Sequence, residues 1–252
     1  MLALFAHPDD ETFGPGATLA RLAAQGHDVQ VVCATRGESG TIDRSAHIGR
    51  RRLAALREQE LVQACRALGV NPPWIFTFPD RALIRLEEET LLRPFVRAVR
   101  TFRPDVMISF HADGISGHPD HRTVTARAVS AYHEAAERDR WPDLGRPHAA
   151  QRFWAYCVPE SRARLVTTRK LFAVPDAEID VVIDAGEYML AKRAAVEAHA
   201  TQKLFVERME KQLGNLDGFW GKESFVLAES RCPLPPGGTR PVNDLFAGMQ
   251  PA

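Results

Sequence analysis

Residues 2–11 read Leu-Ala-Leu-Phe-Ala-His-Pro-Asp-Asp-Glu, and this stretch indicates both the fold class and the position of a ligand site. Leu2–Ala6 is a continuous apolar run, which is typical of a strand buried on both faces of a parallel sheet. Polar and acidic residues follow it without a spacer. Ligands bind where the carboxyl ends of parallel strands meet, so we expect residues 7–11 to lie at such a site.

The rest of the chain alternates apolar runs with segments of helical period. The expected strands are Leu2–Ala6, Asp28–Thr35, Trp74–Phe78, Asp105–Phe110, Phe153–Val158 and Ile179–Ile183. The expected helices are Gly16–Gln25, a segment from Leu53 that ends at Gly69, Glu87–Phe102, one opening at Pro119, Glu187–His199 and a stretch reaching Leu213. This order predicts an α/β fold: one Rossmann-like domain over residues 1–252, with helices on both faces of a mostly parallel sheet. A Pro- and Gly-rich tail from about residue 232 is not expected to form a regular element.

Composition narrows the function classes. The chain has 252 residues, with 32 Lys plus Arg and 32 Asp plus Glu, so its formal net charge is zero and nucleic-acid binding is disfavoured. The apolar run at the start is too short for a signal-peptide core, and no later run has the length that spans a bilayer. We therefore expect a cytoplasmic protein with no membrane partner. The four cysteines form no CxxC pair, which argues against a zinc-thiolate site.

His7, Asp9 and Asp10 stand together after the first strand. Two adjacent carboxylates and a histidine at a buried rim are costly unless a cation offsets the charge. A metal ion is the simplest candidate.

A second group of polar residues, Gly117-His118-Pro119-Asp120-His121, follows the strand that ends near Phe110. Pro119 suits the first position of a helix, which makes His118 the expected N-cap, and the offset of three puts His118 and His121 on one side of the opening turn. His7, Asp10 and His121 would supply the two-histidine, one-carboxylate set of a catalytic zinc site, and Asp9 would remain free as general base.

Five motifs in order resemble those of the LmbE-like, or PIG-L, family of zinc-dependent N-deacetylases. They cover roughly residues 1 to 230 and read AHPDDE (6–11), TRGESG (35–40), REQEL (57–61) with Leu68-Gly69, FPD (78–80) and GHPDH (117–121). The chain looks most like the bacterial branch that deacetylates N-acetylglucosaminyl precursors of bacillithiol and mycothiol. The resemblance implies a hydrolase of an acetamido sugar, such as N-acetylglucosaminyl-malate, with one Zn²⁺ or another divalent ion per chain on His7, Asp10 and His121.

The resemblance also implies roles for the remaining motif residues. Asp9 matches the general base, His118 the histidine that stabilises or protonates the tetrahedral intermediate, and Asp120 its partner. We expect the Asp120 carboxylate to hydrogen-bond the His118 ring, raise its proton affinity and so make the rate fall at alkaline pH. Arg57 matches an arginine that contacts substrate and Asp80 an aspartate that contacts sugar hydroxyls.

Several alternatives stay open. An amidase acting on a larger thiol-conjugate amide would use the same metal site, and a sugar-binding protein would keep the fold without catalysis. Glu11 is either a support for a metal ligand or a charge at the start of a helix. His199, near Thr201 and Gln202, resembles a C-terminal family segment, although a structural role is the simpler interpretation. A homo-oligomer is also an open expectation, because bacterial members of the family often form one.

Overall fold

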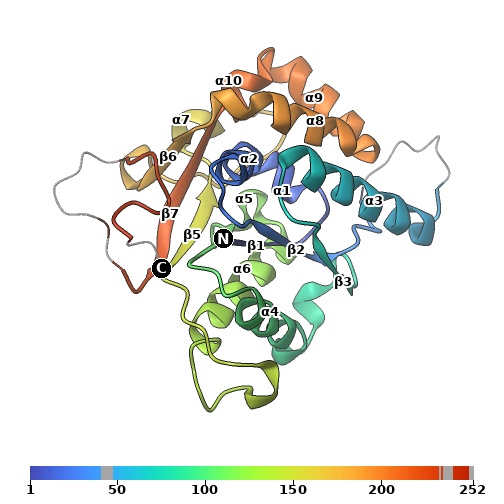
Figure 1. The fold of residues 1–252 in the computed structure, drawn as a ribbon. Helices are drawn as coiled ribbons and strands as arrows, with labels where there is room; N and C mark the ends of the chain where they lie inside the picture. The colour runs from blue at the N-terminus through green and yellow to red at the C-terminus, as the bar shows by residue number, and fades with distance from the viewer. Residues whose placement is uncertain (41–47, 233, 235–240, 250–252) are drawn as a thin grey trace.

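A computed structural model of the protein describes residues 1–40, 48–232, 234 and 241–249, and within them seven strands form one sheet (Figure 1). Across the sheet, the strands are β3 (Trp74–Phe78), β2 (Gln30–Thr35), β1 (Leu2–Phe5), β4 (Val106–Phe110), β5 (Arg152–Cys157), β7 (Lys222–Ser230) and β6 (Val181–Asp184). The first five are parallel, whereas β7 runs antiparallel to both of its neighbours. The predicted α/β fold with a mostly parallel sheet is confirmed.

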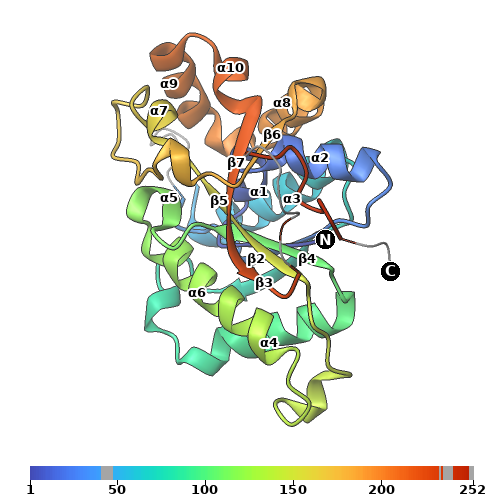
Figure 2. The ribbon, with the colours of Figure 1, turned by 90° about the vertical axis from the view of Figure 1, so that its left-hand side faces the viewer.

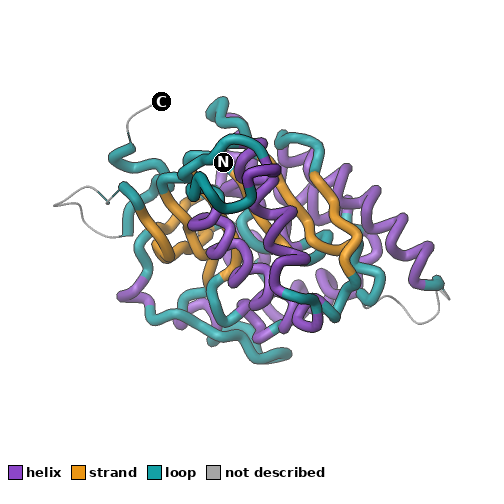
Figure 3. Tube along the Cα trace, turned by 90° about the horizontal axis from the view of Figure 1, so that it is seen from below, coloured by secondary structure: helices purple, strands orange, loops and turns teal. Residues whose placement is uncertain are grey.

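Helices cover both faces of this sheet. They are α1 (Asp10–Phe13), α2 (Gly16–Ala24), α3 (Arg50–Leu68), α4 (Glu88–Phe102), α5 (Gly114–Gly117), α6 (Pro119–Glu134), α7 (Glu160–Ala163), α8 (Met189–Ala198), α9 (Lys203–Leu213) and α10 (Leu216–Trp220). Helices α4 and α6 lie below the sheet, and α2, α3 and α8 lie above it (Figure 1). The view from below shows helices lying across the strands (Figure 3).

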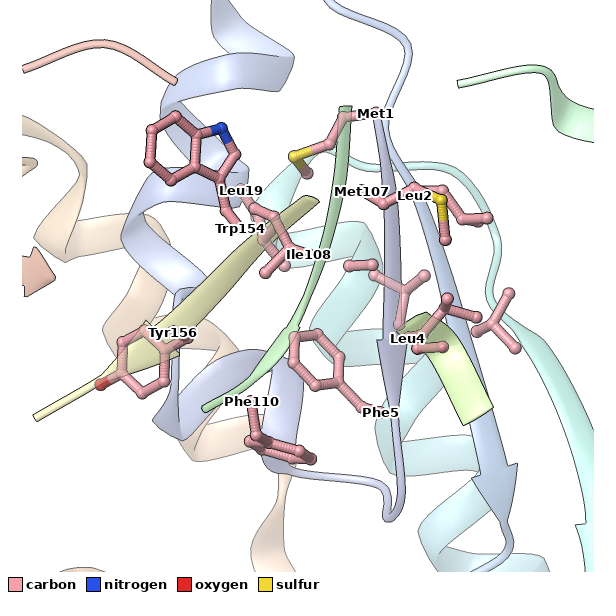
Figure 4. Packing of buried hydrophobic residues seen from close by; sticks show 14 of the residues in the cluster. Met1, Leu2, Leu4, Phe5, Leu19, Met107, Ile108, Phe110, Trp154 and Tyr156 are labelled. Carbon is pink, nitrogen blue, oxygen red and sulfur yellow. The ribbon is translucent and has the colours of Figure 1, made fainter. Parts of the chain in front are cut away.

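Strand β1 lies in the middle of the parallel part and fixes the position of everything that follows it. It pairs with β2 on one side and β4 on the other, and all four of its residues are buried. Leu4 and Phe5 pack among Met107, Ile108 and Phe110 in the core (Figure 4). Because each large apolar side chain buried in this way stabilises the fold by roughly 1.5–3 kcal/mol, the end of β1 is a rigid support for residues 6–11.

Strand β7, which lies beside β5 in Figure 2, is absent from the strands that the sequence predicts. Its apolar run, Phe225–Ala228, is short and has charged residues near both ends. One of these, Glu223, is only 1% exposed. A buried charge at a strand position breaks the apolar pattern by which strands are recognised in a sequence.

Glu223 is buried because Lys192 of α8 pairs with it at 2.6 Å. Its carboxylate also accepts the backbone N–H groups of Ala17 and Thr18 in the first turn of α2, while the Lys192 ammonium donates to the carbonyl of Gly14. The pair therefore ties α8 and β7 to the start of α2. Removing one partner alone would leave the other charge buried without compensation.

The tail from about residue 232 was expected to lack regular structure, and part of it lies outside the described residues. In the described part, Val242 forms an isolated bridge with Val181, and the Leu245 carbonyl accepts the indole N–H of Trp154. Leu245 is 1% exposed, so this irregular segment still packs on the sheet. Among the described residues, no helix combines the length and the apolar character needed to cross a bilayer.

Candidate metal centre and active site

The predicted site residues converge at the carboxyl edge of the parallel strands. This set comprises His7, Asp9 and Asp10 after β1, Arg57 on α3, Asp80 after β3, and His118, Asp120 and His121 at the start of α6. All of them except Asp120 line one pocket of about 380 Å³, and Asp120 is fully buried behind it. This edge is where an open parallel sheet is expected to bind its ligand.

Three of these side chains form a triangle with the spacing of metal ligands. His7 Nδ1 lies 3.2 Å from His121 Nε2, and Asp10 carboxylate oxygens lie 3.5 Å from His7 Nδ1 and 3.3 Å from His121 Nε2. Four ligands placed tetrahedrally about 2.0–2.1 Å from zinc are roughly 3.3–3.4 Å apart. The two histidine nitrogens therefore have the spacing of ligands in a tetrahedral site, and Asp10 faces each of them with a different carboxylate oxygen.

His118 could also contribute to a metal site. Its ring has a nitrogen within 4.8 Å of nitrogens on His7 and His121, so a three-histidine set is sterically open as well.

Partners behind the two triangle histidines select the nitrogen that faces the centre. His7 Nε2 is 3.3 Å from Asp120 Oδ2 and 3.2 Å from Asp80 Oδ1, and His121 Nδ1 is 3.2 Å from the carbonyl of Gly114. A carboxylate or carbonyl behind a ligating histidine fixes its tautomer and ring orientation. These contacts leave His7 Nδ1 and His121 Nε2 free to bind a cation.

The same contacts shift the pKa values of the cluster. Burial alone would lower the pKa of His7, but the hydrogen bonds with Asp10, Asp120 and Asp80 hold it well above its ordinary value. For Asp10, burial acts upward, yet the charge and hydrogen bond of His121 hold its pKa well below the usual range. In this arrangement the triangle attracts positive charge. A metal ion would replace the proton that His7 otherwise holds.

Asp80 and Asp120 have partners other than those the resemblance implies. Asp80 accepts the Ser39 N–H with its second oxygen, and Asp120 accepts the backbone N–H groups of Arg81 and Leu83. Both carboxylates therefore support His7. The Asp120 carboxylate is expected to accept a hydrogen bond from the His118 ring, but in the structure the Asp120 backbone N–H donates to His118 Nδ1 instead.

This backbone contact determines the state of His118. As predicted, His118 is the N-cap of α6 and Pro119 its first residue. Because Nδ1 accepts an N–H, the proton of the neutral ring is on Nε2. Burial, with the charges of His7 and His121, lowers the pKa of His118 below its ordinary value. The expectation of a raised proton affinity is therefore wrong, and the ring is neutral around pH 7.

Asp9 is held in a strained backbone conformation and lies against Arg57. Its φ of 119° and ψ of −25° are in a region that non-glycine residues rarely adopt, at a cost of roughly 1–3 kcal/mol. Arg57 Nη2 lies 2.9 Å from Asp9 Oδ2 and also donates to the carbonyl of Pro8. Burial raises the pKa of Asp9 to about 6, against the lowering effect of Arg57.

Arg57 was expected to contact substrate, but the structure uses its guanidinium inside the protein. The side chain is 3% exposed, and Nη1 donates to the Gly37 carbonyl at 2.9 Å. Gly37 has a φ of +66°, and a Cβ there would lie 2.3 Å from Arg57 Nη1, so only glycine fits this approach. Arg57 thus holds Asp9 in place, and a direct contact with substrate stays a prediction.

The walls of the pocket add groups that the sequence analysis did not select. Aromatic side chains make up much of its surface: Phe13, Phe110, Tyr156, Phe205, Phe219 and Trp220. Three exposed arginines, Arg81, Arg169 and Arg208, also line it. Within the described residues, none of the three side chains forms a salt bridge. No motif marks Arg169, which lies in the loop before β6, or Arg208, which lies on α9.

Comparison with known proteins now identifies the family. Residues 2–132 match the model of PIG-L, described as GlcNAc-PI de-N-acetylase. This chain belongs to the PIG-L family. A 1D-myo-inositol 2-acetamido-2-deoxy-alpha-D-glucopyranoside deacetylase of Rhodococcus opacus is 35% identical over 239 residues, which cover 80% of this chain and 81% of that protein. A similarly named protein of Catenulispora acidiphila is 33% identical, and the matched region covers 99% of this chain and 97% of that protein.

The fold is shared with a solved structure of low sequence identity. The N,N'-diacetylchitobiose deacetylase of Pyrococcus horikoshii superposes with a TM-score of 0.68 over 90% of this chain and 82% of its own, at 20% identity. The family match and the relatives' names show that this chain is an enzyme of the deacetylase class, a hydrolase of amide bonds, as the motifs predict.

The two candidate ligand sets, one with Asp10 and one with His118 beside the same two histidines, predict different metal contents for the His118→Ala variant. If His7, Asp10 and His121 bind the metal, His121→Ala should lose most of the ion, since an open site has few ligands to spare, whereas His118→Ala should keep about one ion per chain. Elemental analysis of both purified variants, beside the wild type, measures this. Metal loss in both His118→Ala and His121→Ala would instead favour the three-histidine set of His7, His118 and His121, and metal loss in His118→Ala alone would exchange the roles of His118 and His121.

Proposed function

We propose that this enzyme is a zinc-dependent hydrolase that removes the acetyl group from an N-acetylglucosamine derivative with an acidic aglycone, such as N-acetylglucosaminyl-malate, in the cytoplasmic synthesis of a low-molecular-weight thiol. The main support is the His7, Asp10 and His121 triangle with Asp9 beside it. The names of the 35% and 33% identical relatives support an acetamido-sugar substrate.

A zinc ion in this triangle supplies Lewis acidity toward the amide carbonyl and the attacking water. Asp9 accepts the proton of that water. Its pKa of about 6 leaves it ionised at pH 7 and close to the operating pH, as suits a general base. Arg57 keeps the carboxylate oriented while this proton is exchanged.

His118 donates a hydrogen bond from its Nε2–H to the oxygen of the tetrahedral intermediate and keeps its proton. A neutral imidazole can do this because its other nitrogen is occupied by the Asp120 N–H. Collapse of the intermediate needs a proton on the amine. After the first step Asp9 carries one, so Asp9 serves as base and then as acid, and His118 keeps a fixed protonation state.

The three pocket arginines support an acidic aglycone. Guanidinium groups without a carboxylate partner bind carboxylate or phosphate through charge-assisted, often bidentate hydrogen bonds. The relatives named above act, by their names, on a glycoside of inositol, which carries no charge. Arg169 and Arg208 are therefore the proposed anion contacts, and the homo-oligomer expected from the sequence stays a prediction.

A substrate panel tests the proposal. Zinc-loaded enzyme should release acetate and a primary amine from N-acetylglucosaminyl-malate with a higher kcat/KM than from the inositol glycoside or a thiol-conjugate amide. Arg169→Ala and Arg208→Ala should each lower kcat/KM for the malate substrate by about 10- to 100-fold, the scale of a lost charge-assisted bond of roughly 1.5–3 kcal/mol. Equal losses on the neutral inositol glycoside would contradict an anionic contact. Preference for the thiol conjugate would favour the amidase.

Asp9→Asn tests the general base. The variant should retain its metal, because Asp9 is outside the triangle, and lose about 100-fold or more in kcat. Elemental analysis measures the retained metal, and steady-state kinetics on the best substrate of the panel measure kcat. Turnover near the wild-type level in the metal-replete variant would place the base elsewhere.

His118→Ala tests the oxyanion role. Loss of a donor to the intermediate should reduce kcat by about 10²- to 10³-fold. Because the pKa of His118 is lowered, the ring takes up a proton only as the pH falls and is already neutral through the alkaline range. The alkaline limb of the kcat profile should therefore have the same midpoint in wild type and variant. A limb that disappears in the variant would show that a protonated His118 is required.

A further inference from the structure

Glu11 lies directly behind the proposed base. Its Oε2 accepts the backbone N–H of Asp9 at 3.0 Å. Asp9 is the residue with the strained φ of 119°. Glu11 Oε1 lies 2.7 Å from His199 Nε2, and both Glu11 and His199 are fully buried. Glu11 is thus the partner of the Asp9 backbone, and both His199 and the Thr12 hydroxyl contact the other oxygen of Glu11.

His199 begins a short turn that also contacts α3. Residues Ala200–Gln202 form a 3₁₀ helix between α8 and α9, and Thr201 donates its backbone N–H and its hydroxyl to the Glu60 carboxylate at 2.8 and 2.6 Å. Glu60 lies one turn after Arg57 on α3, against which α8 packs (Figure 1). Gln202, from the same turn, lines the pocket.

We propose that the turn His199–Gln202 is a positioning clamp for the general base, with His199 and Glu11 as positioning residues that act through the Asp9 backbone. One arm runs from His199 through Glu11 to the Asp9 N–H. The other runs from Thr201 through Glu60 to α3, whose Arg57 holds the Asp9 carboxylate. The two arms orient the backbone and the side chain of one residue, and this inference rests on the proposed role of Asp9.

A local feature supports a role beyond packing. His199 Nδ1 is buried and has no hydrogen-bond partner among the described residues, so the contact with Glu11 is the one hydrogen bond that the ring forms within them, while Phe13 lies beside the ring. The buried Lys192–Glu223 pair also joins the C-terminal helices to the N-terminal motif, but it contacts Gly14 and the start of α2 and not Asp9. It is therefore a matched control for a merely structural connection.

Two amide substitutions that differ in reach test the clamp. The amide nitrogen of His199→Gln can reach the position of Nε2 and donate to Glu11, whereas that of His199→Asn is one methylene too short. We expect His199→Asn to lower kcat about 10- to 100-fold, with KM within about twofold and the metal retained, because small displacements of a catalytic group are costly. His199→Gln should recover most of the loss. The double variant K192M/E223Q should lose thermal stability but keep kcat.

An assay without substrate separates this inference from the proposed function. Hydrogen–deuterium exchange of the peptide that contains Asp9 should be faster in His199→Asn than in wild type, His199→Gln or K192M/E223Q. Unchanged exchange and kcat in His199→Asn, or an equal loss of kcat in K192M/E223Q, would overturn the clamp. A wild type that is inactive on every acetamido sugar would count against the proposed function, and the exchange result would still decide on the clamp.

If His199→Asn does not fold, Thr201→Val tests the second arm by removing only the hydroxyl donor to Glu60. A lower kcat with unchanged metal content supports the clamp. Wild-type kcat with wild-type exchange in the Asp9 peptide overturns it.

Discussion

Five carboxylates crowd together at the end of β1, and the need to compensate their charge in a buried place governs the site. They belong to Asp9, Asp10, Glu11, Asp80 and Asp120, and all but Asp9 are at most 8% exposed. An unpaired buried carboxylate would cost several kcal/mol, so each has acquired a cationic or N–H partner. His7 stands at the centre, with carboxylates near both ring nitrogens. Where Asp10, His7 and His121 face one another, each Asp10 oxygen lies near one ring nitrogen, and in the proposed function a divalent cation would complete the compensation.

The positions of these residues in the fold could be predicted from the sequence, because they depend on local patterns. The apolar run before His7 predicts β1, and Pro119 after His118 predicts the start of α6 and its N-cap. Parallel strands bring their carboxyl ends to one edge, which is enough to place both motifs in one pocket. Strand β7 could not be predicted in this way, since Glu223 occupies a buried strand position and is stable there only through Lys192.

The partners of the motif residues could not be predicted from the sequence. Asp120 follows His118 by two residues, yet its carboxylate contacts His7, 113 residues away, and only its backbone N–H contacts the His118 ring. Burial and the charges of His7 and His121 lower the pKa of His118, where the sequence predicts a rise. Arg57 is likewise a motif residue whose partner, Asp9, depends on how α3 packs. Side-chain direction at a helix start or on a helix face is set by such packing, which local patterns do not encode.

The backbone strain at Asp9 has a direct chemical consequence. Asp9 and Asp10 are adjacent, and the proposed function gives them different roles: Asp10 would bind the ion, and Asp9 would stay away from it and move protons. With ordinary helical backbone at both residues, the two side chains would be only about 100° apart on one short turn. The φ of 119° at Asp9 turns its carboxylate to Arg57, while Asp10, the first residue of α1, points into the triangle. A strained residue persists only where its surroundings determine its conformation, and here the Glu11 carboxylate and the Arg57 guanidinium do so from opposite ends of the residue. The separation of the proposed base from the proposed ligand in one dipeptide therefore depends on the Glu11 carboxylate and the Arg57 guanidinium.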